Sequence, residues 1–164
     1  MELTKIGLSG GCYWCTEAVF QSLIGVEEVT QGFISSEGKN ETFSEAVIVY
    51  FNKKIALKTL LEIHLHTHKC TVNHAMRNKY RSAIYYFTAV EKEESEHILT
   101  TLQLDFKNQI ITQILPFKNF KRSIEASQNY YIKNPQKPFC KKYIHPKLDL
   151  IERKFSSHAN TPAN

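Results

Sequence analysis

Cys12 is the residue of this sequence whose position best suits a chemically reactive side chain. It follows the pair Gly10-Gly11 and precedes residues 13–24, whose apolar side chains have helical spacing. A thiol at the start of a helix lies where backbone N–H groups and the helix dipole favour a negative charge. Because the thiolate is the nucleophilic form of cysteine, this position predicts a thiol that reacts near neutral pH. The alternative is a small buried residue that only packs well.

The other cysteines extend the choice of chemistry. The chain has four, Cys12, Cys15, Cys70 and Cys140, and its N-terminus shows no secretory signal. Without a secreted context, a structural disulfide framework is disfavoured, and redox, metal-binding or simple packing roles remain. Cys12 and Cys15 form a C-x-x-C pair, a spacing that supports redox-active disulfides in other folds.

A group of histidines raises the question of a metal site. These residues are His64, His66, His68 and His74, with Cys70 among them. Their spacing fits no standard zinc pattern. We therefore predict no metal here, and we expect a partly exposed helix end whose last-turn histidines interact well with the helix dipole.

Hydrophobic periodicity predicts the elements that position these residues. We expect strands over 3–9, 26–34, 42–51 and 80–88, and helices over 13–24 and 55–68. This β-α-β-β-α-β order predicts an α+β fold with a ferredoxin-like core. A helix over 89–107, a strand over 110–115 and a short helix over 122–132 should follow, and then an irregular docked tail from Pro138.

Length and composition set the outer limits. The chain has 164 residues, 42% of them hydrophobic, which suits one domain, expected over 1–155, with a disordered polar end over 156–164. The net charge is +5, and the bases concentrate after residue 117 without the motif of a nucleic-acid reader. No apolar run reaches the roughly 18 residues of a membrane span. We therefore expect a cytoplasmic protein that binds neither nucleic acid nor membrane.

Four segments together carry a family resemblance. The string GGCYWCTEAVF at 10–20 resembles the signature of A-type peptide methionine sulfoxide reductases, which reads Gly-Cys-Phe-Trp followed closely by Glu. The family's Gly-His-Ala-Glu-Ala-Val, Tyr-Arg-Ser and Asn-Pro-x-Gly-Tyr-Cys segments are similar to SEAV at 44–47, YRSAIY at 80–85 and NPQKPFC at 134–140. The resemblance covers most of residues 7–145.

The resemblance implies an enzyme that reduces the S epimer of methionine sulfoxide, in peptides, in proteins or as the free amino acid, without a bound cofactor. Cys12 is then the nucleophile on sulfur, and Glu45 is the acid that protonates the departing oxygen. A glutamate does this near neutral pH only if burial keeps it partly protonated. The apolar run AVIVY after Glu45 predicts such burial. The alternative is a strand residue that faces solvent.

The substrate pocket is also implied by resemblance. Tyr13 and Trp14 match an aromatic pair of the family, which has phenylalanine in place of Tyr13, and they would form the apolar wall for the S-methyl group. Tyr80 matches a tyrosine that hydrogen-bonds the sulfoxide oxygen. The alternatives are that Trp14 is an ordinary core residue and that Tyr80 has a surface hydroxyl.

The cycle needs a second thiol, because attack leaves Cys12 as a sulfenic acid. Cys140 matches the tail cysteine of the family and is our first choice for the thiol that closes the disulfide; Cys15 is the alternative. Thioredoxin or a similar dithiol would then restore the enzyme, which we expect to be a monomer.

Some features depart from the family pattern. The stretch from Gly32 to Glu45 is shorter than usual and lacks a second oxygen-binding tyrosine, and Asn73, His74 and Ala75 stand where the family has an aspartate. His74 is a candidate replacement. Two rival functions follow: a redox sensor or thiol-disulfide exchanger with weak or lost reductase activity, and a noncatalytic module that binds methionine-bearing peptides.

Overall fold

The structure is a computed structural model that describes residues 3–160. Its strands are β1 Thr4–Ser9, β2 Val26–Ser35, β3 Ser44–Phe51, β4 Ala83–Tyr86, β5 Gln113–Pro116 and β6 Asn119–Arg122. Its α-helices are α1 Tyr13–Gln21, α2 Leu57–Thr67, α3 Ala89–Leu102, α4 Tyr130–Lys133 and α5 His145–Lys154. The predicted order β-α-β-β-α-β is confirmed for the first six of these elements, and the fold is α+β.

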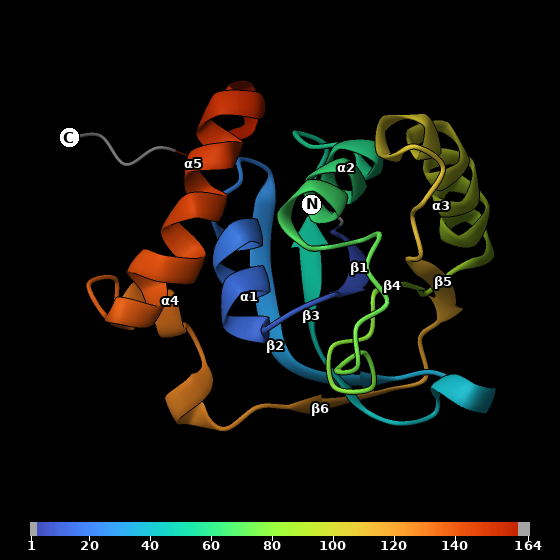
Figure 1. The fold of residues 1–164 in the computed structure, drawn as a ribbon, viewed down its shortest axis with the longest axis horizontal. Helices are drawn as coiled ribbons and strands as arrows, with labels where there is room; N and C mark the ends of the chain where they lie inside the picture. The colour runs from blue at the N-terminus through green and yellow to red at the C-terminus, as the bar shows by residue number, and fades with distance from the viewer. Residues whose placement is uncertain (1–2, 161–164) are drawn as a thin grey trace.

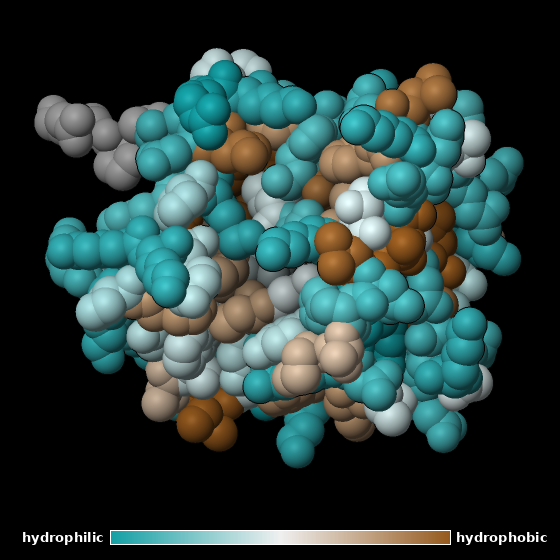
Figure 2. All heavy atoms as spheres, viewed as in Figure 1, coloured by the Kyte–Doolittle hydropathy of each residue, from teal (hydrophilic) through white to brown (hydrophobic). Residues whose placement is uncertain are grey.

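The strands form one sheet in the order β5-β4-β1-β3-β2-β6. All neighbouring pairs are antiparallel except β4 and β5, which are parallel. Figure 1 shows the sheet curling, with α1, α2 and α5 in front of it and α3 beside β4 and β5. The face seen there is mostly hydrophilic, with hydrophobic side chains gathered toward its right-hand side (Figure 2).

Both faces of the central strands are buried. Ile6 and Leu8 of β1 and Val47 and Val49 of β3 point toward the helices, where they join the main core. The alternate residues of β3 pack with Tyr85 and other side chains in a second cluster on the opposite face. Successive side chains of a strand point to opposite faces, so a strand buried on both sides reads as a continuous apolar run. This explains the run after Glu45.

The antiparallel pairing brings three distant segments to one end of the sheet. β1 ends at Ser9, which pairs with Ala83 at the start of β4, and Leu8 pairs with Val47 near the start of β3. The turn after β1 therefore meets the segments that enter β3 and β4. Cys12, Glu45 and Tyr80 belong to these three segments.

The C-terminal tail differs from the prediction. Residues from Pro138 do not form an irregular segment: a π-helical turn over Cys140–Ile144 leads directly into α5. Pro146 is the second residue of α5 and follows the π-helical turn directly. Ile151 and Phe155 are buried in the main core, and this burial stabilises the helix.

Other differences are local. Strand β6, on the edge of the sheet beside β2, was not expected, and a 3-10 turn over Glu125–Ser127 followed by α4 replaces a continuous helix over 122–132. The disorder expected from residue 156 is wrong for 156–160: Ser156–His158 form a 3-10 turn and Ala159 bridges to Leu23. The rest of that expectation, 161–164, lies outside the described residues. No helix within 3–160 is long and apolar enough to cross a membrane.

Candidate active site

Cys12 occupies the N-cap position of α1, as its sequence context predicts. Its carbonyl accepts the first hydrogen bonds of the helix, from the N–H groups of Cys15 and Thr16. Its thiol is therefore at the N-terminus of the helix, where a negative charge is favoured.

The surroundings of Cys12 favour its thiolate. A hydrogen bond from the Cys15 thiol lowers the pKa of Cys12 most, with help from the backbone N–H groups of Trp14 and Cys15, while burial and the charge of Glu45 act in the opposite direction. The same pairing raises the pKa of Cys15, as does its burial. A negative charge on this pair is therefore favoured on Cys12 over Cys15.

Glu45 lies next to this thiol and is buried, with 6% of its surface exposed. Its Oε1 accepts a hydrogen bond of 3.1 Å from the N–H of Tyr13, the residue after Cys12. Its Oε2 lies 3.7 Å from Nζ of Lys79. Burial raises the pKa of Glu45, although the Tyr13 N–H and the Lys79 ammonium partly oppose this effect. The burial expected from the sequence is confirmed.

An aromatic cluster packs beside Cys12. The ring of Trp14 stacks on Tyr130 of α4 at 3.7 Å between centroids, with planes 6° apart, and Phe139 meets its edge at 5.3 Å. Tyr13 packs against Phe33 of β2 at 5.5 Å. The predicted pair is therefore part of a wall of five rings. Phe139 precedes a cysteine of interest and Tyr130 lies in a short helix, but neither carries a local signal of this role.

A cavity of about 270 Å³ opens on the other side of Cys12, between α1, α2 and the C-terminal helices. Tyr80 lines it, as do Cys15, Phe139, Tyr143 and Lys147. The sequence therefore placed Tyr80 correctly near Cys12, but gave no indication of Tyr143 or Lys147. A larger cavity of about 340 Å³ lies between α1, α4 and α5 and contains none of the thiols.

Cys140 lies in the same packed cluster as Cys12 and Cys15, but with no exposed surface. It begins the π-helical turn that precedes α5, so it is held in a helix and not in a mobile segment. Burial raises its pKa. Both candidate partners of Cys12 therefore lie in its cluster, and Cys15 is the one whose thiol lowers the pKa of Cys12.

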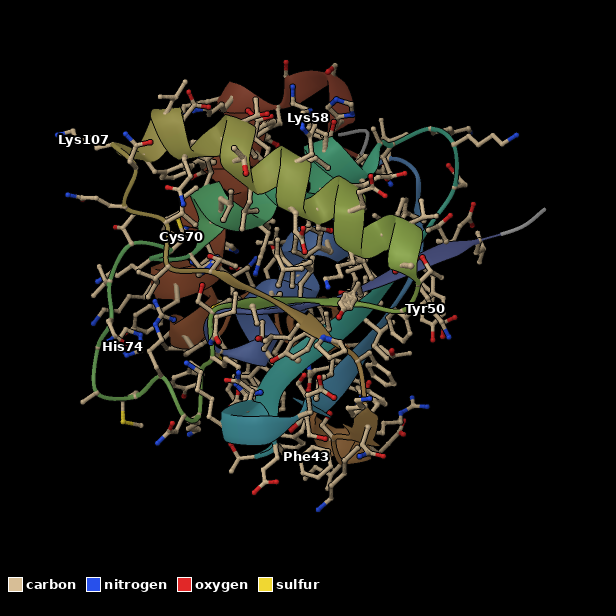
Figure 3. The ribbon with its side chains drawn as sticks, turned by 90° about the vertical axis from the view of Figure 1, so that its right-hand side faces the viewer. Phe43, Tyr50, Lys58, Cys70, His74 and Lys107 are labelled. Atoms are coloured by element: carbon tan, nitrogen blue, oxygen red, sulfur yellow. The ribbon has the colours of Figure 1, made fainter. Side chains whose placement is uncertain are left out.

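The segment between α2 and β4 carries the departures from the family pattern. His74 does not line the cavity beside Cys12, and its imidazole accepts a hydrogen bond from the N–H of Met76. Figure 3 shows His74 on this outer segment, beyond Cys70. Arg77 is the residue that ties the segment down. Its guanidinium donates to the carbonyls of Gly10, Lys69, Val72 and Tyr80, which links the turn before Cys12 to the entry of β4.

The histidines of α2 are more buried than expected. His64 bonds the carbonyl of Ser9, and His68 bonds the carbonyl of His64 and the hydroxyl of Ser82. Burial lowers the pKa of His64 to about 4 and that of His68 well below its ordinary value. Both rings are therefore neutral near pH 7, so the expectation that they interact with the helix dipole as cations is wrong for these two.

Glu17 of α1 forms hydrogen bonds that hold the start of α4. Its carboxylate accepts hydrogen bonds from the N–H groups of Asn129 and Tyr130 and from the amide of Gln31. Because Asn129 and Tyr130 begin α4, Glu17 holds the ring that stacks on Trp14. Burial raises the pKa of Glu17, while these hydrogen bonds lower it.

We expect Glu17→Ala to lower the free energy of unfolding by about 2–4 kcal/mol, because it leaves buried donors without an acceptor. Urea unfolding measures the loss. Glu28→Ala, at an exposed position of β2, is the control and should change stability by less than about 0.5 kcal/mol. Equal effects of the two changes would contradict this account of Glu17.

A thiolate at a helix N-terminus, a buried carboxyl beside it and further thiols within reach together define a thiol-dependent oxidoreductase. The family model described as peptide methionine sulfoxide reductase matches residues 4–159. The peptide methionine sulfoxide reductase MsrA of Trichodesmium erythraeum is 35% identical over 170 aligned residues, which cover 93% of this chain and 96% of that protein.

Solved structures agree. Reduced Mxr1 from Saccharomyces cerevisiae is similar with a TM-score of 0.74 and 26% identity, over 87% of this chain and 91% of that chain. Mxr1 in complex with Trx2 gives a TM-score of 0.63 and 26% identity, over 79% and 85%. The chain belongs to the peptide methionine sulfoxide reductase family, and it is an oxidoreductase that reduces methionine sulfoxide.

Proposed function

We propose that this enzyme reduces the S epimer of methionine sulfoxide, in peptides, in proteins or as the free amino acid, through attack of the Cys12 thiolate on the sulfoxide sulfur. Glu45 gives its proton to the sulfoxide oxygen as that oxygen leaves the substrate. The hydroxide that leaves then bonds to the sulfur of Cys12 as the bond between the two sulfurs breaks. The products are methionine and a sulfenic acid on Cys12, so the oxygen and two oxidising equivalents pass from the substrate to the enzyme.

The rest of the site supports this step. Tyr13 and Trp14, backed by Tyr130 and Phe139, offer an apolar wall for the S-methyl group. Tyr80 lines the cavity that Cys12 opens into, and we assign its hydroxyl to the sulfoxide oxygen.

The cycle then closes through an intramolecular disulfide. Cys140 and Cys15 both lie in the cluster that contains Cys12, so either thiol can attack the sulfenic acid and release water. The complex of the similar protein Mxr1 with Trx2 supports a thioredoxin-like dithiol as the reductant of this disulfide.

One observation carries the proposal. The carboxyl of Glu45 is buried and accepts the N–H of the residue next to the nucleophile. A pure thiol-disulfide exchanger needs no acid there, whereas removal of an oxygen from sulfur does. The direct Cys12–Cys15 interaction is what favours the second candidate, a redox sensor or thiol-disulfide exchanger.

The experiment is turnover of each purified epimer of a blocked methionine sulfoxide, with dithiothreitol as reductant. We expect reduction of the S epimer and, within detection, none of the R epimer. Cys140→Ala and Cys15→Ala variants are compared in the same assay, with the disulfide in each identified by mass spectrometry. Loss of one candidate thiol should leave the other as the only partner of Cys12.

Either of two results would reject the proposal. Turnover of the R epimer alone would reverse the assignment of stereochemistry. A folded protein that reduces neither epimer, yet exchanges disulfides with a small dithiol, would favour the exchanger.

We infer that the four strands β4-β1-β3-β2 form a ferredoxin-like core, which the strand order and the antiparallel pairing support. Four free cysteines support a reducing, cytoplasmic compartment. A monomeric state is proposed for the single domain over 1–155, and light scattering tests it.

A further inference from the structure

The cavity between α1, α2 and α5 contains a charge that the reductase step does not use. Of the described residues that line it, Lys147 is the only lysine or arginine. Its ammonium donates to the carbonyl of Thr67, the last residue of α2. This carbonyl is one of the acceptors that a helix leaves free at its C-terminus, where a cation is favoured.

The hydrogen bond fixes Lys147 in the wall opposite the thiols. No carboxylate within residues 3–160 forms an ion pair with it, so its charge is not neutralised by an acidic side chain. The remaining polar contacts of the cavity are neutral, because burial lowers the pKa of His64 to about 4 and leaves His68 uncharged as well. The cavity therefore pairs one cation with two thiols.

We propose that Lys147 is the counter-cation of Cys15, and that it stabilises the Cys15 thiolate while this thiol attacks the sulfenic acid of Cys12. The inference rests on the proposed function for the source of that sulfenic acid. It also assigns the closing of the disulfide to Cys15 ahead of Cys140, which the sequence had placed first.

The charges around Cys15 explain why its thiol stays protonated in the reduced enzyme and can attack after Cys12 has been oxidised. In the reduced pair, the hydrogen bond between the Cys15 thiol and the Cys12 thiolate, together with burial, raises the pKa of Cys15. Conversion of Cys12 to a neutral sulfenic acid removes both the hydrogen bond to a thiolate and the repulsion between two negative sulfurs. Lys147, the one cation among the described residues that line the cavity, lowers the pKa of Cys15 and still acts on it after this change.

The effect of Cys15 on the pKa of Lys147 supports the same pairing. Burial lowers the pKa of Lys147, and the attraction of Cys15 opposes this more strongly than the attraction of Cys12. Lys69, on the surface nearby, weakens the ammonium form slightly. The titratable groups around the pair are thus Cys12 and Cys15 of α1, His64 and His68 at the end of α2, Lys69 after it, and Tyr80, Cys140 and Tyr143.

The step balances without another reactant. The Cys15 thiolate forms a bond to the sulfur of Cys12, the S–O bond of the sulfenic acid breaks, and the hydroxide that leaves takes a proton to become water. Cys15 and Cys12 end as a disulfide, and the ammonium of Lys147 is unchanged.

The test measures disulfide formation over a single turnover, without external reductant, between pH 6 and pH 9. Cys140→Ala is the background, so that Cys15 is the only candidate partner in the cluster. Reduced enzyme is mixed with the S epimer of a blocked methionine sulfoxide, or separately with hydrogen peroxide, and is quenched by alkylation. Mass spectrometry then follows the sulfenic acid, trapped with dimedone, and the Cys12–Cys15 disulfide.

We expect Lys147→Met to slow disulfide formation on the order of tenfold at pH 7, because an opposite charge at this range changes a pKa by about one unit or more. The deficit should shrink as the pH rises toward the raised pKa of the buried Cys15 thiol, because ionisation then needs less help from the ammonium. Lys147→Arg keeps the charge and should stay within about threefold of the unchanged lysine. Lys154→Met, at an exposed position of the same helix, is the matched control and should have no effect.

Three results would overturn the inference. One is a Lys147→Met deficit that is the same at every pH, because loss of the Thr67 contact alone would act in this way. Another is an unchanged rate in Lys147→Met. The third is that Cys15→Ala, with Cys140 present, closes its disulfide as fast as the wild type.

Failure of the proposed function is recognised separately. If no methionine is released, the reductase assignment fails, whereas peroxide still makes the sulfenic acid of Cys12 and tests Lys147.

Discussion

Cys12→Ser should abolish reduction of the S epimer of methionine sulfoxide, with a loss of at least about a thousandfold in kcat. A serine hydroxyl at this position is not ionised near neutral pH, and it cannot form the sulfur product from which the disulfide is made. The α1 N-terminus and the Cys15 donor lower the pKa of a thiol, but they cannot bring a hydroxyl into the useful range. The release of methionine, measured by chromatography with dithiothreitol as reductant, gives the result.

Cys70→Ala is the matched control for this substitution. Cys70 is buried just after the C-terminal end of α2, does not line the Cys12 cavity, and has its pKa raised to about 11 by burial. We expect this variant to keep turnover within about twofold. If Cys12→Ser retained a tenth of the activity, Cys12 would not be the nucleophile. We expect the folded Cys12→Ser protein still to bind sulfoxide peptides. A wild-type protein that binds these peptides but never releases methionine would instead indicate a noncatalytic binding module.

The parts of the site that could be predicted from sequence are those with local causes. Gly10-Gly11 before a helical pattern places Cys12 at a helix N-terminus, and this needs no distant contact. The apolar run after Glu45 reports a strand buried on both faces, so the burial of its carboxyl could be inferred as well. Tyr80 was placed by resemblance, and the antiparallel pairing of β1 with β4 explains why it lies near the thiol.

The missed parts depend on contacts between distant segments. Pro135, Pro138 and Pro146 suggested an irregular tail, but Pro146 lies in the first turn of α5, and burial of Ile151 in the core stabilises that helix. Because the tail is helical, Lys147 reaches the end of α2, and no pattern in either helix alone predicts that contact. Strand β6 is short and polar, and its pairing with β2 defines it.

Arg77 shows the same limit. In sequence it is one basic residue in a polar loop, yet it connects four carbonyls and joins the turn before Cys12 to β4. The segment between α2 and β4 is thus held by one side chain, and of these four contacts only the one to Gly10 spans a long distance in sequence.

Glu45→Gln should lower kcat for the S epimer by about a hundredfold or more, because an amide cannot give a proton to the leaving oxygen. The amide oxygen can still accept the Tyr13 N–H, so the local structure should be kept. Removal of the carboxylate also removes a charge that raises the pKa of Cys12. Alkylation of Cys12 by iodoacetamide near pH 7 should therefore be as fast as in the wild type or faster, which separates loss of the acid from damage to the nucleophile.

The pH dependence of kcat should follow the protonation of Glu45. Burial raises the pKa of Glu45, so the protonated acid persists above the usual range of a glutamate and is lost as the pH rises through its raised value. The kcat of the wild type, measured on the methionine-releasing step, should fall on the alkaline side of that value and should reflect the Cys12 thiolate on the acid side. In Glu45→Gln the alkaline fall should disappear along with most of the rate. A kcat within fivefold of the wild type, with the alkaline fall intact, would mean that another group, with Tyr80 the nearest candidate, donates the proton.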